Sequence, residues 1–403
     1  MPPKKLKNKS ESNTESNSAD PQPINNDKKR QQVVEALRKF LQTLRTLRGL
    51  IEGNVNPSSK EEINFTEPVS QKQIETICDL ITQSSTKFNI LFSNLSDVES
   101  SSITQLDEFE QNMMFFVSTY TTLAAANERQ LSVSILKQKA KMMFLNVMDS
   151  LILLLQAAIK NSKDELLRST GLVWESCKTL KTLSLNDFLI TKEEIEQTQI
   201  PIVKDAISEL EETFEQFDPN QQNKSKSSEE WEEFDQKISP NLLNSIPHIL
   251  QLSRLAFTIL KKIVDTLNMF AQSESLQQQN RQNQQQQQKI KLVDLLDKLH
   301  NVTKDIPELV DDVCCCVYID DFEADDEDED ENENENKDNR VLQQIELNSS
   351  KLAESCVKMI EIQTDLLKTH STVLSQKEMD LHITFSNLLK QKIESTLNSM
   401  RMN

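Results

Sequence analysis

The sequence predicts an all-α protein made of two antiparallel helical bundles. Three glycines in 403 residues leave few positions for tight turns or phosphate-binding loops, which argues against a sheet-rich or nucleotide-binding α/β fold. Apolar residues recur over long stretches at steps of three and four, the spacing of one face of a helix. Only residues 313–319 have the composition of a strand. Because no neighbouring stretch would pair with them, we expect them to continue a helix.

The first part of the chain contains a polar tail and four expected helices. Residues 1–26 are rich in Ser and Asn and are predicted to be a disordered tail. Helices are expected over 27–53, 74–95 and 103–126, followed by one from Asn127 to about residue 160. This last helix includes the most apolar stretch, 142–159. Since polar residues interrupt that stretch, we interpret it as a buried core helix that does not span a membrane.

Two further helices complete the predicted N-terminal bundle, residues 27–218. Ser162 and Glu165 form a capping-box pattern before a helix that contains Trp174. We predict that Trp174 packs in the core with Cys177; the alternative is an interface position, where tryptophan is enriched. The following helix is expected to be kinked, or to start late, at Pro201. Its apolar stripe consists of Val203, Ile207, Leu210, Phe214 and Phe217.

An acidic linker over 219–238 is the predicted domain boundary, and residues 239–403 form the predicted C-terminal bundle. A long amphipathic helix begins at Ser239 and Pro240. Two disordered insertions are predicted, one Gln-rich at 272–288 and one acidic at 320–338. The final helix, from Ser375, is expected to bury a stripe consisting of Leu381, Phe385, Leu389, Ile393 and Leu397.

The formal net charge of −19 is concentrated in one place, since residues 320–336 contain twelve acids and no base. Such a run predicts a solvated loop; the alternative is a segment that attracts a basic partner. We do not expect direct binding to nucleic acid, because an acidic chain without a clustered basic helix repels phosphates.

No pattern in the sequence predicts catalysis, a cofactor or a metal site. The N-terminus has no apolar signal-peptide core, so the six cysteines are expected to be reduced thiols in a cytosolic or nuclear protein. Adjacent cysteines on a helix point about 100° apart, so Cys314, Cys315 and Cys316 cannot converge on one ion. The four histidines are never closer than twelve residues in sequence. We therefore predict a non-enzymatic protein.

Four residues are candidates for binding a partner protein. Trp231 lies among acids in the predicted linker, without an obvious helical face to bury it. Arg254, Lys261 and Lys262 are predicted on the exposed side of the helix that begins at Pro240, where together they would suit an acidic partner surface. The alternative for these three is an ordinary solvated helix face.

Several short motifs, in order along the chain, resemble the cyclin-D-interacting (GCIP) family. They are Val173-Trp174-x-x-Cys177, Val203-Lys204-Asp205-Ala206, Asp218-Pro219, Glu229-Glu230-Trp231-Glu232-Glu233, Leu260-Lys261-Lys262-Ile263, Val310-Asp311-Asp312 and Leu347-Asn348-Ser349-x-Lys351-Leu352. The resemblance implies an all-α architecture similar to talin- and vinculin-type bundles.

The resemblance also implies a function. Proteins of this family bind D-type cyclins, reduce the activity of the cyclin-dependent kinase and act as negative regulators of cell-cycle progression in nucleus and cytoplasm. They are also described as helix-loop-helix proteins that restrain transcription factors by pairing. We therefore expect a D-type cyclin or cyclin–kinase complex as partner, and helix-loop-helix proteins as further partners. The Gln-rich and acidic tracts depart from the family pattern. The alternative is a cytoskeleton-associated helical scaffold.

Overall fold

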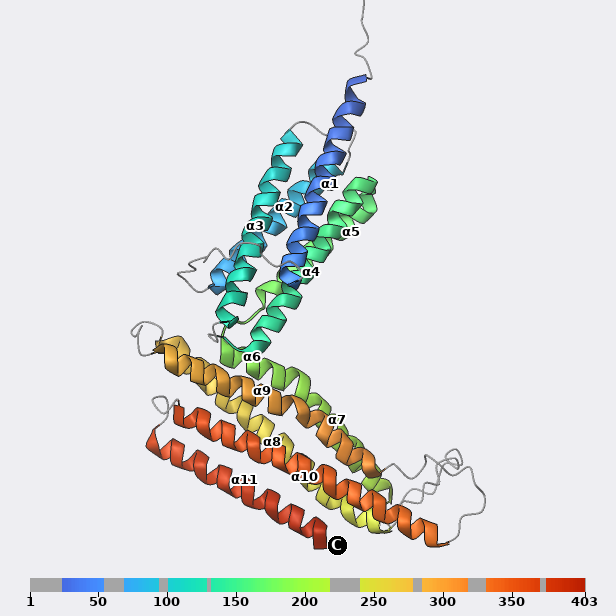
Figure 1. Ribbon diagram of the computed structural model, residues 1–403, viewed down its shortest axis with the longest axis vertical. Helices are drawn as coiled ribbons and strands as arrows, with labels where there is room; N and C mark the ends of the chain where they lie inside the picture. Colours follow the sequence, from blue (N-terminus) through green and yellow to red (C-terminus); the bar gives the residue numbers. More distant parts are fainter. Residues whose placement is uncertain are drawn as a thin grey trace, which may run out of the picture. The chain divides into compact units, whose positions relative to one another are not determined.

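A computed structural model describes residues 24–53, 69–93, 101–128, 132–217, 240–277, 285–317, 331–369 and 375–402. Within these ranges the chain is helical apart from short turns and caps, and contains no strand, which confirms the predicted all-α fold (Figure 1). The predicted linker 219–238, with Trp231, lies outside the described residues.

The helices follow the predicted order. They are α1 (Ile24–Glu52), α2 (Gln71–Phe92), α3 (Ser101–Glu128), α4 (Ser134–Lys160), α5 (Lys163–Lys181), α6 (Asp187–Glu194), a π-helical turn (Ile195–Gln199), α7 (Ile200–Phe217), α8 (Pro240–Gln277), α9 (Gln285–Cys315), α10 (Glu331–Thr369) and α11 (Gln376–Met402). The predicted start of the fourth helix at Asn127 is wrong, because α3 continues to Glu128 and α4 begins at Ser134. Residues 313–315 end α9, as predicted.

Helix extends into the ends of both predicted insertions. In the Gln-rich tract α8 runs to Gln277 and α9 begins at Gln285, and in the acidic tract α10 begins at Glu331. The prediction of disorder over the whole of 272–288 and 320–338 is therefore wrong at these ends. Gln and Glu are good helix formers, so a neighbouring packed helix continues into them. The middle of each tract lies outside the described residues.

The described residues pack into two compact units. Unit 1 comprises those within Met1–Lys60, Thr76–Val117 and Leu145–Lys178, and unit 2 those within Glu61–Glu75, Ser118–Phe144 and Thr179–Asn403. This division differs from the predicted bundles 27–218 and 239–403, because α6 and α7 pack against α8 and α9 in unit 2. The predicted boundary was the polar linker, where the apolar pattern is interrupted. In the structure the chain passes from one unit to the other within α3, α4 and α5, where the apolar pattern continues.

Unit 1 has an aromatic core centred on α3. The ring centroid of Phe109 lies 5.5 Å from that of Phe40 on α1 and 6.0 Å from that of Phe88 on α2, both in edge-on geometry. Such pairs contribute about 0.5–1.5 kcal/mol each beyond the area they bury. Leu106 and Phe116 are also buried, as the periodicity of this helix predicted.

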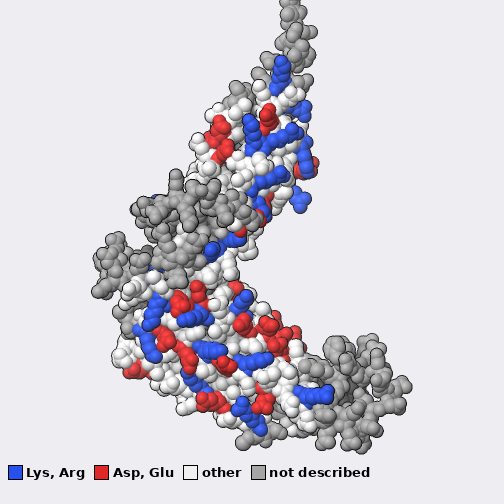
Figure 2. Space-filling model, viewed as in Figure 1, with Lys and Arg blue, Asp and Glu red and all other residues white. Residues whose placement is uncertain are grey.

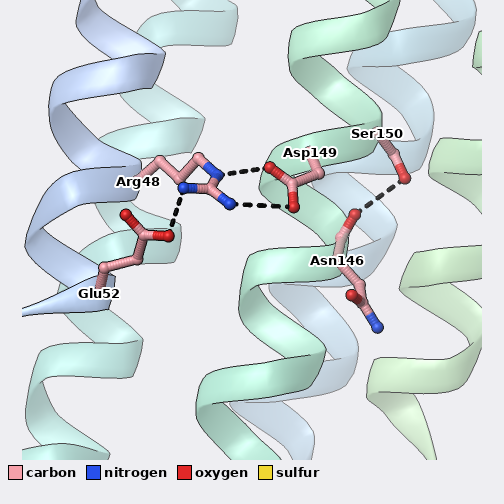
Figure 3. A network of polar contacts seen from close by, with 5 residues as sticks. All are labelled: Arg48, Glu52, Asn146, Asp149 and Ser150. Atoms are coloured by element: carbon pink, nitrogen blue, oxygen red, sulfur yellow. Dashed lines mark hydrogen bonds and ion pairs between the residues drawn. The ribbon is translucent and has the colours of Figure 1, made fainter.

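The polar residues that interrupt α4 form contacts between helices of unit 1 (Figure 3). The Arg48 guanidinium of α1 donates hydrogen bonds to both carboxylate oxygens of Asp149 and to Glu52. The bond to Asp149 raises the pKa of Arg48. Ser150 lies 2.8 Å, oxygen to oxygen, from Ser176 on α5. Among the described helices, α4 is long and apolar enough to cross a membrane. Half of its most apolar 18-residue stretch is nevertheless buried inside the protein.

The predicted core position of Trp174 is wrong. On α5 the buried stripe contains Val173, Cys177 and Leu180, while Trp174 is 45% exposed. Trp174 instead shares an exposed stripe with Leu167 and Gly171, at steps of four and three. A step of three from Cys177 rotates the side chain by about 60° around the axis, which is enough to leave the core face.

In unit 2, α10 contacts α8, α9 and α11, and α7 contacts α8 and α9. The rings of Phe188 on α6 and Phe270 on α8 lie 5.4 Å apart between centroids. The buried Gln363 of α10 donates hydrogen bonds to Thr266 Oγ1 (2.8 Å) and to the Lys262 carbonyl (3.2 Å) of α8, which fixes the register of these two helices.

The apolar stripe of α7 is buried at Val203, Ile207 and Leu210, as predicted. On α11 the predicted stripe is wrong at Leu381, which is 70% exposed. A stripe of four-residue steps alone drifts by about 40° per step around the helix, so its first and last members cannot share one face. The buried side of α11 instead follows mixed steps of three and four, through Ser386, Leu389, Ile393 and Thr396.

Candidate functional site

A groove of about 780 Å³ lies in unit 2, where the first turns of α4 meet the π-helical turn, the start of α7 and the middle of α9. We call it the α4–α7–α9 groove. It is lined by Ser134, Ile135, Gln138, Lys139, Met142, Glu194, Thr198, Gln199, Ile202, His300, Asn301, Lys304, Pro307, Glu308 and Asp311. Its volume is in the range of small-molecule and peptide pockets.

Polar contacts hold the start of α4 against the rest of unit 2. The Asp297 carboxylate of α9 accepts hydrogen bonds from the backbone N–H (2.8 Å) and the hydroxyl (2.9 Å) of Ser134. Asp187 of α6 accepts the N–H of Val133 at 3.0 Å. These carboxylates satisfy donors at the helix N-terminus, where negative charge is also favoured by the helix dipole. They fix one wall of the groove.

An ion pair joins α4 to α6 at the groove. Lys139 Nζ lies 3.0 Å from Glu194 Oε2, and both side chains are about three-quarters buried. This pair balances one positive and one negative charge on the groove wall. The other charged residues that line the groove are Lys304, Glu308 and Asp311 on α9.

The wall formed by α6 and α7 contains a π-helical turn, Ile195–Gln199, directly before Pro201. A proline has no N–H, and in a regular α-helix its ring would clash with the carbonyl of Gln197, four residues earlier. The wider π turn relieves that clash, which confirms the predicted distortion at Pro201. Such turns often occur at functional sites.

The α9 wall contains a second proline and a buried histidine. Pro307 lies inside the helix, so the carbonyl of Thr303 loses the donor it would have had four residues later. His300 is 9% exposed, and its burial lowers its pKa; the nearby charges of Glu194 and Asp297 oppose this effect. His300 is therefore neutral at pH 7.

Two buried polar atoms in these walls have no hydrogen-bond partner in the described part of the chain. They are Oε1 of Gln199, whose side chain is 3% exposed, and Nδ1 of His300. Each such group costs about 1–3 kcal/mol. Met142 and Ile202, in contrast, line the groove with 56% and 47% of their surface exposed. The groove thus combines exposed apolar side chains with unsatisfied polar groups.

Comparison with known proteins relates one segment of the chain to a protein family. Residues 73–216 match the family model described as Grap2 and cyclin-D-interacting, N-terminal. This segment is similar to the N-terminal domain of that family. The resemblance found in the sequence is thereby confirmed for this segment. A search of curated proteins found no match.

The matched segment contains part of the groove. Its walls from α4, the π-helical turn and α7 belong to the matched residues, whereas α9 lies beyond residue 216. Helices outside the matched segment are therefore needed to complete the groove.

The sequence-predicted binding residues do not meet at this groove. Arg254 of α8 donates hydrogen bonds to Glu211 of α7 at 2.7 and 3.0 Å. Lys261 lies over the ring of Phe257, 4.4 Å from its centroid, and Lys262 lies near Asp265 and the ring of Phe385 on α11. Arg254 and Lys262 thus contact different neighbours of α8, namely α7 and α11. Their role in binding a partner stays a prediction.

Charges over unit 2 are also mixed in sign, as Figure 2 shows for one face of the molecule. The picture shows blue and red side chains interspersed over α9, α10 and α11, without an extended field of one sign. A general electrostatic attraction of partners to this face is therefore weak.

The cysteine triplet is divided by the helix. Cys314 and Cys316 are buried and Cys315 is exposed. Burial raises the pKa of Cys314 to about 12 and also raises that of Cys316, so both thiols stay protonated near neutral pH. Within the described ranges, no group of three or more His, Cys, Asp or Glu side chains is placed to hold a metal ion.

Sequence reasoning missed the groove because its walls are far apart in the chain. Asp297 and Ser134 are separated by 163 positions. Two signals were present: Pro201 marked a distortion, and Pro307 interrupts an otherwise regular helix. Neither proline indicates which helix it faces.

Proposed function

We propose that this protein is a non-enzymatic regulator that binds a D-type cyclin, alone or with its kinase, through the α4–α7–α9 groove. The observation that carries the proposal is the match of residues 73–216 to a cyclin-D-interacting domain whose helices α4 and α7 expose Met142 and Ile202 in this groove. Apolar side chains exposed in a groove are suited to burial by a partner.

Binding of this kind has a consequence for the kinase. A helical protein that occupies a cyclin surface reduces the access of substrate or kinase to it, which requires no chemistry of its own. In this proposal the protein lowers kinase activity toward retinoblastoma-type substrates and slows cell-cycle progression, acting in cytoplasm and nucleus. Pairing with helix-loop-helix proteins, also drawn from the family resemblance, would use the same kind of apolar helix face.

The test uses the purified full chain and a purified D-type cyclin with its kinase. We expect saturable binding in calorimetry and a decrease in phosphorylation of a retinoblastoma fragment as the full chain is added. Fluorescent tagging in cells should show the protein in both compartments. Binding without any change in kinase activity would retain the partner and reject the regulatory role. Absence of cyclin binding, with recovery of actin-associated proteins from a native extract, would reject the proposal in favour of a cytoskeletal scaffold.

A further inference from the structure

The walls of the α4–α7–α9 groove contain two buried polar side-chain atoms without a hydrogen-bond partner in the described part of the chain. Pro201 and Pro307 also interrupt the regular backbone hydrogen bonding of two helices that form these walls. The two unpaired atoms are Oε1 of Gln199, which is a hydrogen-bond acceptor, and Nδ1 of His300. The unpaired amide oxygen of Gln199 favours an N–H donor on a segment that enters this groove.

The charges on α9 favour a cationic donor. Lys139 is balanced by Glu194 at 3.0 Å. Lys304 of α9 also lines the groove, but residues 305–312 after it contain four acids and no base, and two of these acids, Glu308 and Asp311, line the groove. An anionic segment would meet these carboxylates with like charge, whereas a Lys or Arg side chain would form charge-assisted hydrogen bonds with them.

The apolar lining determines what accompanies the cation. Met142 of α4 and Ile202 of α7 are both about half exposed, and both line the same groove. The long, flexible side chain of methionine adapts to differently shaped apolar groups. The occupant therefore needs at least one large apolar side chain near its cationic one.

From these three features we infer that the α4–α7–α9 groove binds a partner segment in which a Lys or Arg stands beside a large apolar residue. The apolar side chain packs on Met142 and Ile202, and the cationic group lies toward Glu308 and Asp311. The inference rests on the proposed function, since it assigns the chemistry of the segment that a partner inserts. It excludes acidic and phosphorylated segments as occupants.

The experiment pans a phage-displayed library of random peptides on the full-length protein. Peptides that bind at the groove are identified by loss of binding to the double variant Met142→Glu, Ile202→Glu. We expect these peptides to pair Lys or Arg with Leu, Ile, Met or Phe. Their synthetic versions should bind about tenfold or more weakly to the variant Glu308→Lys, Asp311→Lys.

The control is Asp305→Lys, which makes the same type of charge change on the same helix outside the groove lining. It should weaken binding by less than about twofold. The conservative variant Glu308→Gln, Asp311→Asn should give an intermediate loss, and circular dichroism checks that every variant is folded. Groove-dependent peptides that are acidic or purely apolar would overturn the inference, as would equal losses in the charge-reversal and control variants, or a library that yields no groove-dependent peptide.

Parallel binding of a D-type cyclin separates this inference from the proposed function. If cyclin binding is lost in Met142→Glu, Ile202→Glu but unchanged in Glu308→Lys, Asp311→Lys, the groove is the cyclin site and the cationic occupant is wrong. If cationic peptides bind as expected but the cyclin does not bind the wild-type protein, the groove chemistry is right and the proposed partner is wrong.

Discussion

We predict that removing the ion pair between Lys139 and Glu194 changes both the stability of unit 2 and the pKa of His300. The two charged groups are 3.0 Å apart and about three-quarters buried, so the pair lies between exposed pairs, which contribute about 0.2–1 kcal/mol, and fully buried ones, whose disruption costs about 3–5 kcal/mol. We therefore expect Lys139→Met and Glu194→Gln each to lower the free energy of unfolding by about 1–2 kcal/mol. The double variant should lose about 1 kcal/mol less than the sum.

The same substitutions should move the pKa of His300 in opposite directions. Glu194 raises and Lys139 lowers this pKa, on top of the larger lowering by burial. Removing the carboxylate should therefore lower the pKa of His300 further, and removing the ammonium should raise it. The pKa of His300 in each variant is measured by NMR titration of the imidazole, whose signal is assigned with His300→Gln. The stability of each variant is measured by urea unfolding. Shifts of the same sign in both variants, or strictly additive stability losses, would refute this account of the groove wall.

Burial of His300 also sets a pH dependence. Its pKa is lowered in the folded state from the ordinary histidine value of 6.5, so the unfolded chain binds its proton first as the pH falls. This contribution to stability is complete above pH 6.5 and is lost as the pH falls from there through the pKa of folded His300. His300→Gln should have a flatter stability profile over that window, measured by urea unfolding at a series of pH values. Identical slopes for the variant and the wild type would contradict the assignment.

Three further predictions concern single positions. A Cβ added at Gly171 would meet no atom within 4 Å, so Gly171→Ala should stabilise the protein by up to about 1 kcal/mol. Gly53 has φ +82°, so Gly53→Ala should destabilise the protein by a similar amount. Thermal unfolding measures the direction of both changes in stability. Gln363→Leu leaves the buried Thr266 hydroxyl without its donor and should cost about 1–3 kcal/mol in urea unfolding, with Thr266→Val recovering part of the loss. Maleimide should modify Cys315 first among the described cysteines, slowly at pH 7 because burial and Asp311 raise its pKa; faster labelling of Cys314 by mass spectrometry would contradict the described packing.

The helices of this protein are predictable from sequence because each depends on a local pattern. The mixed steps of three and four on α7 correctly located the buried Val203 and Leu210. Leu381 and Trp174 were assigned to the wrong side because spacing was judged without following rotation around the axis. A difference of about 60–100° separates a core position from an exposed one.

The groove depends on long-range packing, which the sequence pattern does not contain. Its ion pair connects Lys139 to Glu194, and Asp297 reaches Ser134 from a helix outside the matched domain. Conversely, Arg254 pairs with Glu211 and Lys261 lies over Phe257 within the protein, and the role of these two residues in binding a partner stays a prediction. Exposure on a helical wheel does not show whether a neighbouring helix supplies a partner.

The most direct test of the central claim is the affinity of a D-type cyclin for the variant Met142→Glu, Ile202→Glu relative to wild type and to Leu381→Glu. Met142 and Ile202 are each about half exposed, so burying the remainder contributes about 1 kcal/mol per side chain, and a buried, unpaired glutamate adds a further penalty. The groove account predicts an affinity loss of about thirtyfold or more for the double variant and less than about twofold for Leu381→Glu, which is exposed on α11 outside the groove lining. Equal affinities for all three folded proteins would show that the cyclin binds elsewhere.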